Sequence, residues 1–437
     1  MNHNMSVYVR RLRATRTRLL LGLLAIGAFA SAAGQTRGQQ GLHVVPSPFI
    51  NNSSLSATAA IADNDIWAVG QIAGSNSSGV TLAEHFDGTS WSVVPTPSVR
   101  GGAFASVAAL ASNDVWAVGS HAAGHNSVNT LIEHWDGATW SVVASPRLPN
   151  GSFLTGVAAA STQDVWAVGD QPGRAIFDSV IEHWDGTSWK VIASPQFTNG
   201  SFLSAVAATS SSDAWAVGDS NSFSTGLVEH WNGQAWSVVS SPSTNISLHA
   251  VTALSLTNAW AAGIGPSIYF PRTLIEQWNG TTWNIVPSPD PTTRGNSFLN
   301  GIAAVSANDI WAVGFYLTSN GTVVQTLIEH WNGTHWAIVP SANANSTVNH
   351  LNGVIAISAT NVWAVGYSFT SNDIKQTLIE HWNGSNWKTV SSPNAGMGGD
   401  NDLNAVTKVP GTTKAWAVGY YSSSRFGPQL TLTERYS

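Results

Sequence analysis

The sequence predicts an all-β protein, an eight-bladed β-propeller made of four-stranded blades. The tetrapeptide WAVG, or a near copy, recurs roughly every 50 residues, and a block related to IEHWDGTSW follows seven of its copies. A third block, related to VVPSP, closes each unit. A repeat of about this length with four short strands is typical of a propeller blade. The eight copies begin at Trp67, Trp116, Trp166, Trp215, Trp260, Trp311, Trp363 and Trp416.

Each unit contains four predicted strands in a constant order. The first is rich in Ala and Val, as in residues 106–110, the second is DVWAVG and the third is TLIEHW. The fourth begins at the Trp of DGTSW and continues through VVPSP. Asp or Asn precedes both the second strand and the hairpin glycine, which favours turns, and the hairpin pair predicts a two-residue turn with positive φ. β-Branched and aromatic residues fill the strands.

The two ends of the chain are expected to complete one blade. The eighth unit stops at TLTERYS and lacks its VVPSP segment, whereas a VVPSP segment without a preceding unit begins at Val44. We therefore expect residues 43–47 to supply the outer strand of the last blade and to close the ring, which leaves no large open sheet edge.

The N-terminal segment has the pattern of a signal peptide. Five arginines precede the apolar run at residues 19–30, and Ala30-Ser31-Ala32 offers small residues for cleavage. The predicted organisation is a signal peptide at 1–32, a short linker at 33–41 and the propeller at 42–437. We expect secretion, to the periplasm or the extracellular space, and no membrane span in the mature chain. An uncleaved N-terminal anchor is the alternative.

Composition excludes several classes of function. The 437 residues include no Cys, which excludes disulfides, thiolate metal sites and cysteine nucleophiles. The first 33 residues hold five of the 18 Lys and Arg and none of the 24 Asp and Glu, so the remainder is strongly acidic. An acidic chain without a basic block is not expected to bind nucleic acid. We expect a monomer without a cofactor.

The blade resembles the Kelch repeat over residues 42–437. VWAVG is similar to the second-strand motif that ends in glycine, and the Trp of DGTSW followed by VVPSP is similar to the fourth strand. Two features depart from Kelch: a single glycine replaces the usual pair, and the third-strand aromatic is mostly Trp. The resemblance implies a propeller and no particular activity, since enzymes, lectins and protein-binding modules share this fold.

Residues repeated in every blade are expected to build blades. All 21 Trp and all eight Glu belong to the repeat, and we expect hydroxyls, indoles or backbone N–H groups to hydrogen-bond the buried glutamates. The His that follows the third-strand Glu also recurs, but its copies lie on different blades and cannot converge on one ion. No metal site is predicted.

The loops between second and third strands vary, and variable loops on a rigid scaffold tend to carry binding. Aromatic residues gather in those of blades 5 to 8, which suits recognition of an extracellular polysaccharide or a partner protein. The alternative is that these aromatic residues simply pack on neighbouring loops. We predict a secreted, non-catalytic binding module. Its candidate ligand-binding residues are Tyr269, Phe270, Phe315, Tyr316, Tyr367, Phe369, Tyr420 and Tyr421.

The alternative function is a propeller enzyme, such as a polysaccharide lyase or glycoside hydrolase, acting at the channel mouth. It requires some of the few polar residues outside the repeat to converge near the axis. No catalytic residue is assigned. The candidates for that convergence are Arg174, Arg272, Arg294, Asp170 and Asp219.

Overall fold

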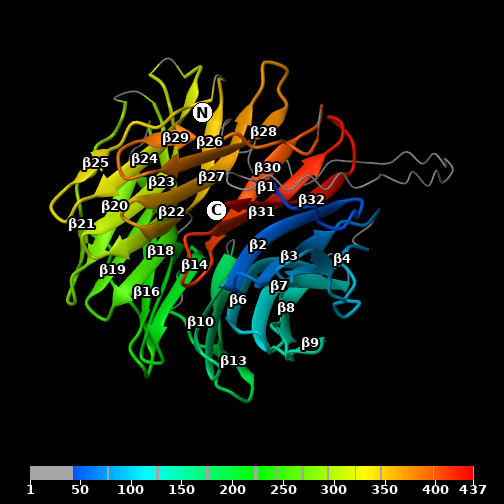
Figure 1. Cartoon of the computed structure of the whole chain (residues 1–437). Coiled ribbons are helices and arrows are strands. Elements are labelled where there is room, and N and C mark those ends of the chain that lie inside the picture. Colours follow the sequence, from blue (N-terminus) through cyan, green and yellow to red (C-terminus); the bar gives the residue numbers. More distant parts are fainter. Residues whose placement is uncertain are drawn as a thin grey trace. The chain divides into compact units, whose positions relative to one another are not determined.

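A computed structural model describes residues 43–436, apart from short gaps inside loops at 76–77, 125–126, 173–176, 196, 198, 221–224, 243, 267–269, 293–294, 320, 345–346 and 397. The described residues form 32 strands in eight antiparallel four-stranded sheets (Figure 1). Within these residues no helix is long and apolar enough to cross a membrane. The predicted all-β, eight-bladed propeller is confirmed.

Each of the first seven blades uses four consecutive strands. Blade 1 consists of β2 (Ser53–Ala62), β3 (Asp65–Ile72), β4 (Val80–Phe86) and β5 (Trp91–Val93). The next six blades follow the same order and have these bounds: β6 (Ala103–Ala111), β7 (Asp114–Gly124), β8 (Ser127–Trp135), β9 (Trp140–Val142); β10 (Phe153–Ser161), β11 (Asp164–Pro172), β12 (Phe177–Trp184), β13 (Trp189–Ile192); β14 (Ser201–Ser210), β15 (Asp213–Ser220), β16 (Thr225–Trp231), β17 (Trp236–Val238); β18 (Ser247–Ser255), β19 (Asn258–Gly265), β20 (Arg272–Trp278), β21 (Trp283–Ile285); β22 (Ser297–Ser306), β23 (Asp309–Leu317), β24 (Val324–Trp331), β25 (Trp336–Ile338); β26 (Asn349–Ser358), β27 (Asn361–Phe369), β28 (Lys375–Trp382), β29 (Trp387–Thr389).

Blade 8 joins both ends of the described chain, as predicted. Its strands are β30 (Asn401–Lys408), β31 (Ala415–Ser422), β32 (Gln429–Tyr436) and β1 (His43–Val44). In Figure 1 the red strands of this blade lie beside the blue β2, which contacts β30 and closes the ring. The closing strand is shorter than the predicted 43–47, because Pro46 has no N–H to continue the ladder.

The bulged residue of the first strand joins neighbouring blades. A register shift after the buried Leu of each first strand, or after Phe104 in blade 2, leaves one residue without a cross-strand partner, such as Ser56 in β2. In five blades a side chain at this position donates a hydrogen bond to the carbonyl oxygen of the corresponding Leu in the next blade, at 2.7–3.0 Å. The donors are Thr155, His249, Asn300, Asn352 and Asn404, which bond to Leu203, Leu299, Leu351, Leu403 and Leu55.

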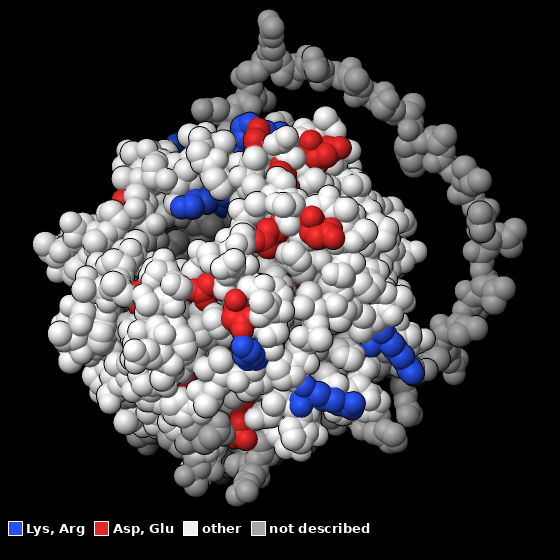
Figure 2. Space-filling model, turned by 90° about the horizontal axis from the view of Figure 1, so that it is seen from below, with Lys and Arg blue, Asp and Glu red and all other residues white. Residues whose placement is uncertain are grey.

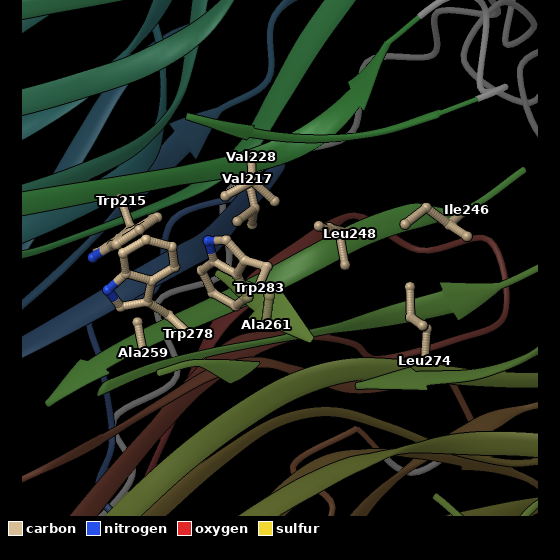
Figure 3. Close-up of a cluster of buried hydrophobic side chains, with 10 residues drawn as sticks. All are labelled: Trp215, Val217, Val228, Ile246, Leu248, Ala259, Ala261, Leu274, Trp278 and Trp283. Carbon is tan, nitrogen blue, oxygen red and sulfur yellow. The ribbon is translucent and has the colours of Figure 1, made fainter. Parts of the chain in front are cut away.

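Tryptophans fill the space between blades. Trp215 is fully buried and stacks on His230 of its own blade, with ring centroids 3.9 Å apart. It also contacts Trp278 and Trp283 of the next blade at 4.9 and 5.1 Å (Figure 3). Buried aromatic pairs of this geometry stabilise beyond the area they bury. The repeated tryptophans are therefore structural, as their number predicted.

The repeated glutamates lie in the same interfaces and are fully buried. In five of the eight, one carboxyl oxygen accepts a hydroxyl hydrogen bond from the preceding blade, as from Ser145 to Glu182 at 2.6 Å and from Ser194 to Glu229 at 2.8 Å. The second-strand indoles at Trp67 and Trp166 make no hydrogen bond within the described residues, so hydroxyls are the donors and the expected indole role is not seen. Burial raises the pKa of Glu182 to about 7.

The turns after the third strand and before the second strand differ from the predicted turns in two ways. Phe86 pairs with Trp91, so the hairpin loop has four residues rather than the predicted two. Its geometry depends on Asp87, whose Oδ1 accepts the backbone N–H groups of Thr89 and Ser90 at 2.8 and 2.9 Å, and on Gly88 with φ of 96°. The Asp before the second strand does more than turn the chain, because Asp65 Oδ1 also lies 2.9 Å from His85 Nε2 and holds its ring against Trp67.

Candidate ligand-binding face

The loops between second and third strands emerge on one face, together with the connections between blades. On blades 6 to 8 these loops span residues 318–323, 370–374 and 423–428, and we call the surface around them the variable-loop face. The residue that follows each WAVG glycine pairs with the residue before the buried Leu of the first strand, as Phe315 does with Phe298. This pairing sets two side chains side by side at the edge of every blade.

On blades 6 and 7 these paired side chains form a continuous aromatic stack. Phe298 and Phe315 lie with ring centroids 4.7 Å apart, and Phe315 contacts His350 of blade 7 at 3.9 Å. His350 in turn stacks on Tyr367 at 4.8 Å, with the ring planes only 12° apart. Phe369 meets Tyr367 edge-on at 5.6 Å. The rings are half-buried and cover one another in part.

A charged pair between blades 7 and 8 lies at the end of this stack. Lys375 Nζ lies 2.6 Å from Asp402 Oδ2, 4.1 Å from the ring centroid of Tyr367 and 6.0 Å from that of Tyr420. Asn352 donates its side-chain N–H to Asp402 Oδ1 at 3.2 Å. Lys375 opens β28, whereas Asp402 lies in β30 of the next blade, so the pair bridges two blades. We call Tyr367, Tyr420 and Asp402 the tyrosine cage.

The electrostatics favour one cation in the cage. Burial lowers the pKa of Lys375, but the Asp402 carboxylate, with help from Tyr420 and Tyr367, outweighs burial and raises it, so the ammonium persists. Burial, together with that ammonium, lowers the pKa of His350 to about 4. His350 is therefore neutral near pH 7 and contributes a ring rather than a charge.

The eight predicted ligand-binding residues have different surroundings. The structure brings Phe315, Tyr367, Phe369 and Tyr420 together around the stack and the cage. Tyr316 instead packs into the interface of blades 5 and 6 and donates its hydroxyl to Gln325, and Tyr421 packs into the core between blades 7 and 8. Phe270, on blade 5, is 39% exposed. Tyr269 lies outside the described residues.

Five residues of this site were not predicted. Phe298, His350 and Asp402 occupy the position before the buried Leu of their first strands, where most other blades carry a small or aromatic residue. Pairing the first strand with the WAVG strand could have identified them. Asn352 is a bulge residue, and Lys375 begins a third strand one blade away from its partner, so neither has a signal in the local sequence.

The residues considered for catalysis are used to hold blades together. Asp170 Oδ1 accepts the N–H of Leu203 at 3.1 Å, and Asp219 Oδ2 accepts the hydroxyl of Ser247 at 2.8 Å, each across a blade interface. Both are at least 95% buried, and burial raises the pKa of Asp170 to about 8 and of Asp219 to about 7. Arg272 donates to the carbonyl of Thr292 at 2.8 Å and pairs with Asp290. Arg174 and Arg294 lie outside the described residues.

Charged side chains are sparse on the one face that Figure 2 presents. Figure 2 shows a face that is almost entirely neutral, with scattered acidic groups and basic side chains beside a hollow. Across the parts of the chain that the structure describes, no group of three or more His, Asp or Glu side chains is arranged to hold a metal ion.

Comparison with known proteins supports the fold and no finer assignment. No protein-family model and no curated protein matches the chain. Sqt1 from Chaetomium thermophilum, solved with the N-terminus of ribosomal protein L10, is similar over 89% of this chain and 98% of its own, with 9% identity and a TM-score of 0.55. Sqt1 without that peptide gives 10% identity and the same TM-score, over 89% of this chain and 96% of its own.

A weaker likeness is to YCF48 from Cyanidioschyzon merolae, with 14% identity and a TM-score of 0.45 over 90% of this chain and 98% of that one. The Sqt1 similarity agrees with a propeller. The resemblance to Kelch repeats remains a prediction, because no family model matches.

Proposed function

We propose that the protein is a non-catalytic binding module that takes a partner protein on the variable-loop face of blades 6 to 8. The aromatic stack with its adjoining charged pair is the observation that carries this proposal. Aromatic side chains are enriched at the centre of protein interfaces and supply many of their hot spots. A rigid ring that holds them in place reduces the entropy cost of binding.

A protein partner suits this surface better than the polysaccharide that the sequence also suggested. Sugars bind aromatic residues by laying a pyranose face on a free ring face. The Tyr367 ring already carries His350 and the Lys375 ammonium, and Phe315 already contacts Phe298 and His350. These contacts leave less of the two ring faces free for a sugar, whereas a polypeptide can also contact ring edges. Sqt1, which shares the fold, was solved with a protein segment bound.

The proposal includes secretion. The arginine-rich start, the apolar run at 19–30 and the small residues that follow support a signal peptide at 1–32, a linker at 33–41 and a propeller at 42–437. An enzyme would need reactive groups open to substrate, and the carboxyls of Asp170 and Asp219 are buried and bonded within the ring.

Peptide selection tests the proposal. A phage-displayed library of random peptides is selected on the protein, and the affinity of the selected peptides is measured for three variants. Phe315→Ala and Tyr420→Ala should each weaken binding about tenfold or more, since interface aromatics are common hot spots. Phe177→Ala removes an aromatic that is 36% exposed from blade 3 and should leave binding unchanged.

A glycan array run in parallel addresses the polysaccharide alternative. If the selected peptides bind Phe315→Ala and Tyr420→Ala with the affinity of the wild type, the proposed site is wrong. Sugar binding that Tyr420→Ala abolishes, with no peptide selected, would overturn the protein partner.

A further inference from the structure

Lys375 occupies a site with the composition of a cation-recognition pocket. Two tyrosine rings and one carboxylate surround its ammonium, at 4.1 Å, 6.0 Å and 2.6 Å. Aromatic faces attract a cation through their quadrupole, and a carboxylate adds a charge-assisted hydrogen bond. A structural ion pair between two blades requires only the carboxylate. The two tyrosine rings add selectivity for an ammonium group, which such an ion pair does not require.

The cage keeps its shape independently of Lys375. Asp402 is held by the side chain of Asn352, which also bonds to the backbone carbonyl of Leu403 at 2.9 Å. Tyr367 is held by its stack on His350 and by the edge of Phe369. The side chains that hold Asp402 and Tyr367 in place would therefore remain if the ammonium of Lys375 left the cage.

Lys375 is placed so that it can leave. It is the first residue of β28, next to the loop at 370–374, and its side chain remains 23% exposed. The side chain is a flexible four-carbon stem whose head group is strongly hydrated. Rotation of the stem would carry the ammonium into solvent without moving the strand.

The local charge favours a second cation. Asp400 lies beside the cage, where its Oδ1 accepts the backbone N–H of Lys375 at 3.0 Å. A second carboxyl side chain therefore lies near Asp402, whose pKa is raised mainly by burial and also by this neighbouring carboxyl.

We propose that the tyrosine cage of Tyr367, Tyr420 and Asp402 binds a lysine side chain of a basic partner segment, and that Lys375 fills the cage in the free protein. The proposal rests on the proposed function and names the chemistry of its partner. Partner binding is then an exchange of one ammonium for another, with the affinity supplied by further contacts of the basic segment. Lys375 acts as an internal competitor that excludes weak or neutral ligands.

Titration calorimetry with hexalysine tests this exchange on the full-length protein. In Lys375→Met the stem keeps its length but the competitor is gone, so hexalysine should bind about tenfold more tightly than to the wild type. Adding Asp402→Asn to that variant should reverse the gain, because the cage loses its carboxylate. Hexaglutamate should bind neither protein. Equal hexalysine affinity for wild type and Lys375→Met would overturn the proposal.

A second measurement uses the wild type and does not depend on the folding of a variant. With ¹⁵N-labelled lysine, the Lys375 ammonium should give an NMR signal displaced by the ring current of Tyr367. Methylammonium should move that signal to the position of free lysine as it takes the cage. A signal that stays displaced at saturating methylammonium would overturn the exchange.

The two proposals fail in distinguishable ways. If selected peptides bind at Phe315 and Tyr420 but methylammonium leaves the Lys375 signal in place, the protein partner stands and the cage is a structural tie. If methylammonium enters the cage but no peptide is selected, the cage binds cations and the proposed protein partner is wrong.

Discussion

Val44 pairs with Glu434 in the outermost strands of blade 8, so residues from opposite ends of the chain complete one sheet. The contact continues beyond the ladder, where Thr433 donates its hydroxyl to the carbonyl of Val45 at 2.5 Å and Ser47 hydrogen-bonds to Thr431. Blade 8 then packs on blade 1 through Asn404 and Leu55. The ring is thus held at its seam by bonds between residues nearly 400 positions apart.

Removal of the closing strand should weaken the whole ring. A chain that begins at Pro48 loses β1 and the bonds of Val45 and Ser47, and we expect a loss of about 3–5 kcal/mol at about 1 kcal/mol per hydrogen bond. A chain that begins at His43 is the matched control. Urea unfolding of the two proteins measures the difference. Equal midpoints would show that the seam does not depend on β1.

Trp166 should be a major contributor to stability. It is fully buried, stacks on His183 at 3.9 Å and meets Trp231 and Trp236 of the next blade. Trp166→Ala should cost about 3–5 kcal/mol, as for other large buried side chains. Phe426→Ala, at a position that is 95% exposed, should change the unfolding free energy by less than about 0.5 kcal/mol. Chemical denaturation followed by circular dichroism compares the two.

The glycine of WAVG should not tolerate a side chain. A Cβ on Gly169 would lie 2.1 Å from the carbonyl oxygen of Phe153 and 2.8 Å from Leu154 Cα, both in the paired strand. Gly169→Ala should destabilise by about 1–3 kcal/mol or more, since backbone must move. Gly353→Ala is the control, because its Cβ would meet only a Val406 methyl at 3.6 Å. Similar thermal midpoints for both variants would show that close contact with the paired strand is not the reason why the blades repeat this glycine.

The buried glutamates should make stability fall as pH rises above neutral. Burial raises the pKa of Glu329 and Glu380 to about 8 and of Glu229 and Glu276 to about 7, from 4.5 in the unfolded chain. Between pH 6.5 and 8 the folded state holds protons that the unfolded state has already lost, so the unfolding free energy decreases with pH. Each unit of pKa shift corresponds to about 1.4 kcal/mol.

Scanning calorimetry at pH 6.5 and pH 8 measures this effect. The midpoint should be lower at pH 8, and Glu329→Gln should reduce the difference because an amide cannot ionise. The lowered pKa of His350, His249 and His381 acts in the opposite direction, but mainly below pH 6.5, where the unfolded imidazoles become charged. A midpoint that rises from pH 6.5 to 8 would show that the glutamates are ionised and paired in the folded protein.

The sequence predicted the candidate site only in part, for a geometric reason. Phe315 and Tyr316 were treated alike as loop aromatics, yet both lie within β23 and adjacent residues of a strand face opposite sides. Phe315 therefore joins the stack while Tyr316 enters a blade interface, and Tyr420 and Tyr421 divide in the same way. These rings belong to the strand ends beneath the variable loops and not to the loops themselves.

By itself the sequence determined the number of blades, the order of their strands and the closure of the ring. Each repeat must bury one face against a copy of itself, so the positions of Trp, Glu and Gly recur wherever a blade recurs. The tertiary structure alone decided which unrepeated residues meet. Lys375 and Asp402 come from different blades, and Phe315 and His350 likewise, so their contacts depend on the packing of one blade against the next rather than on any local pattern.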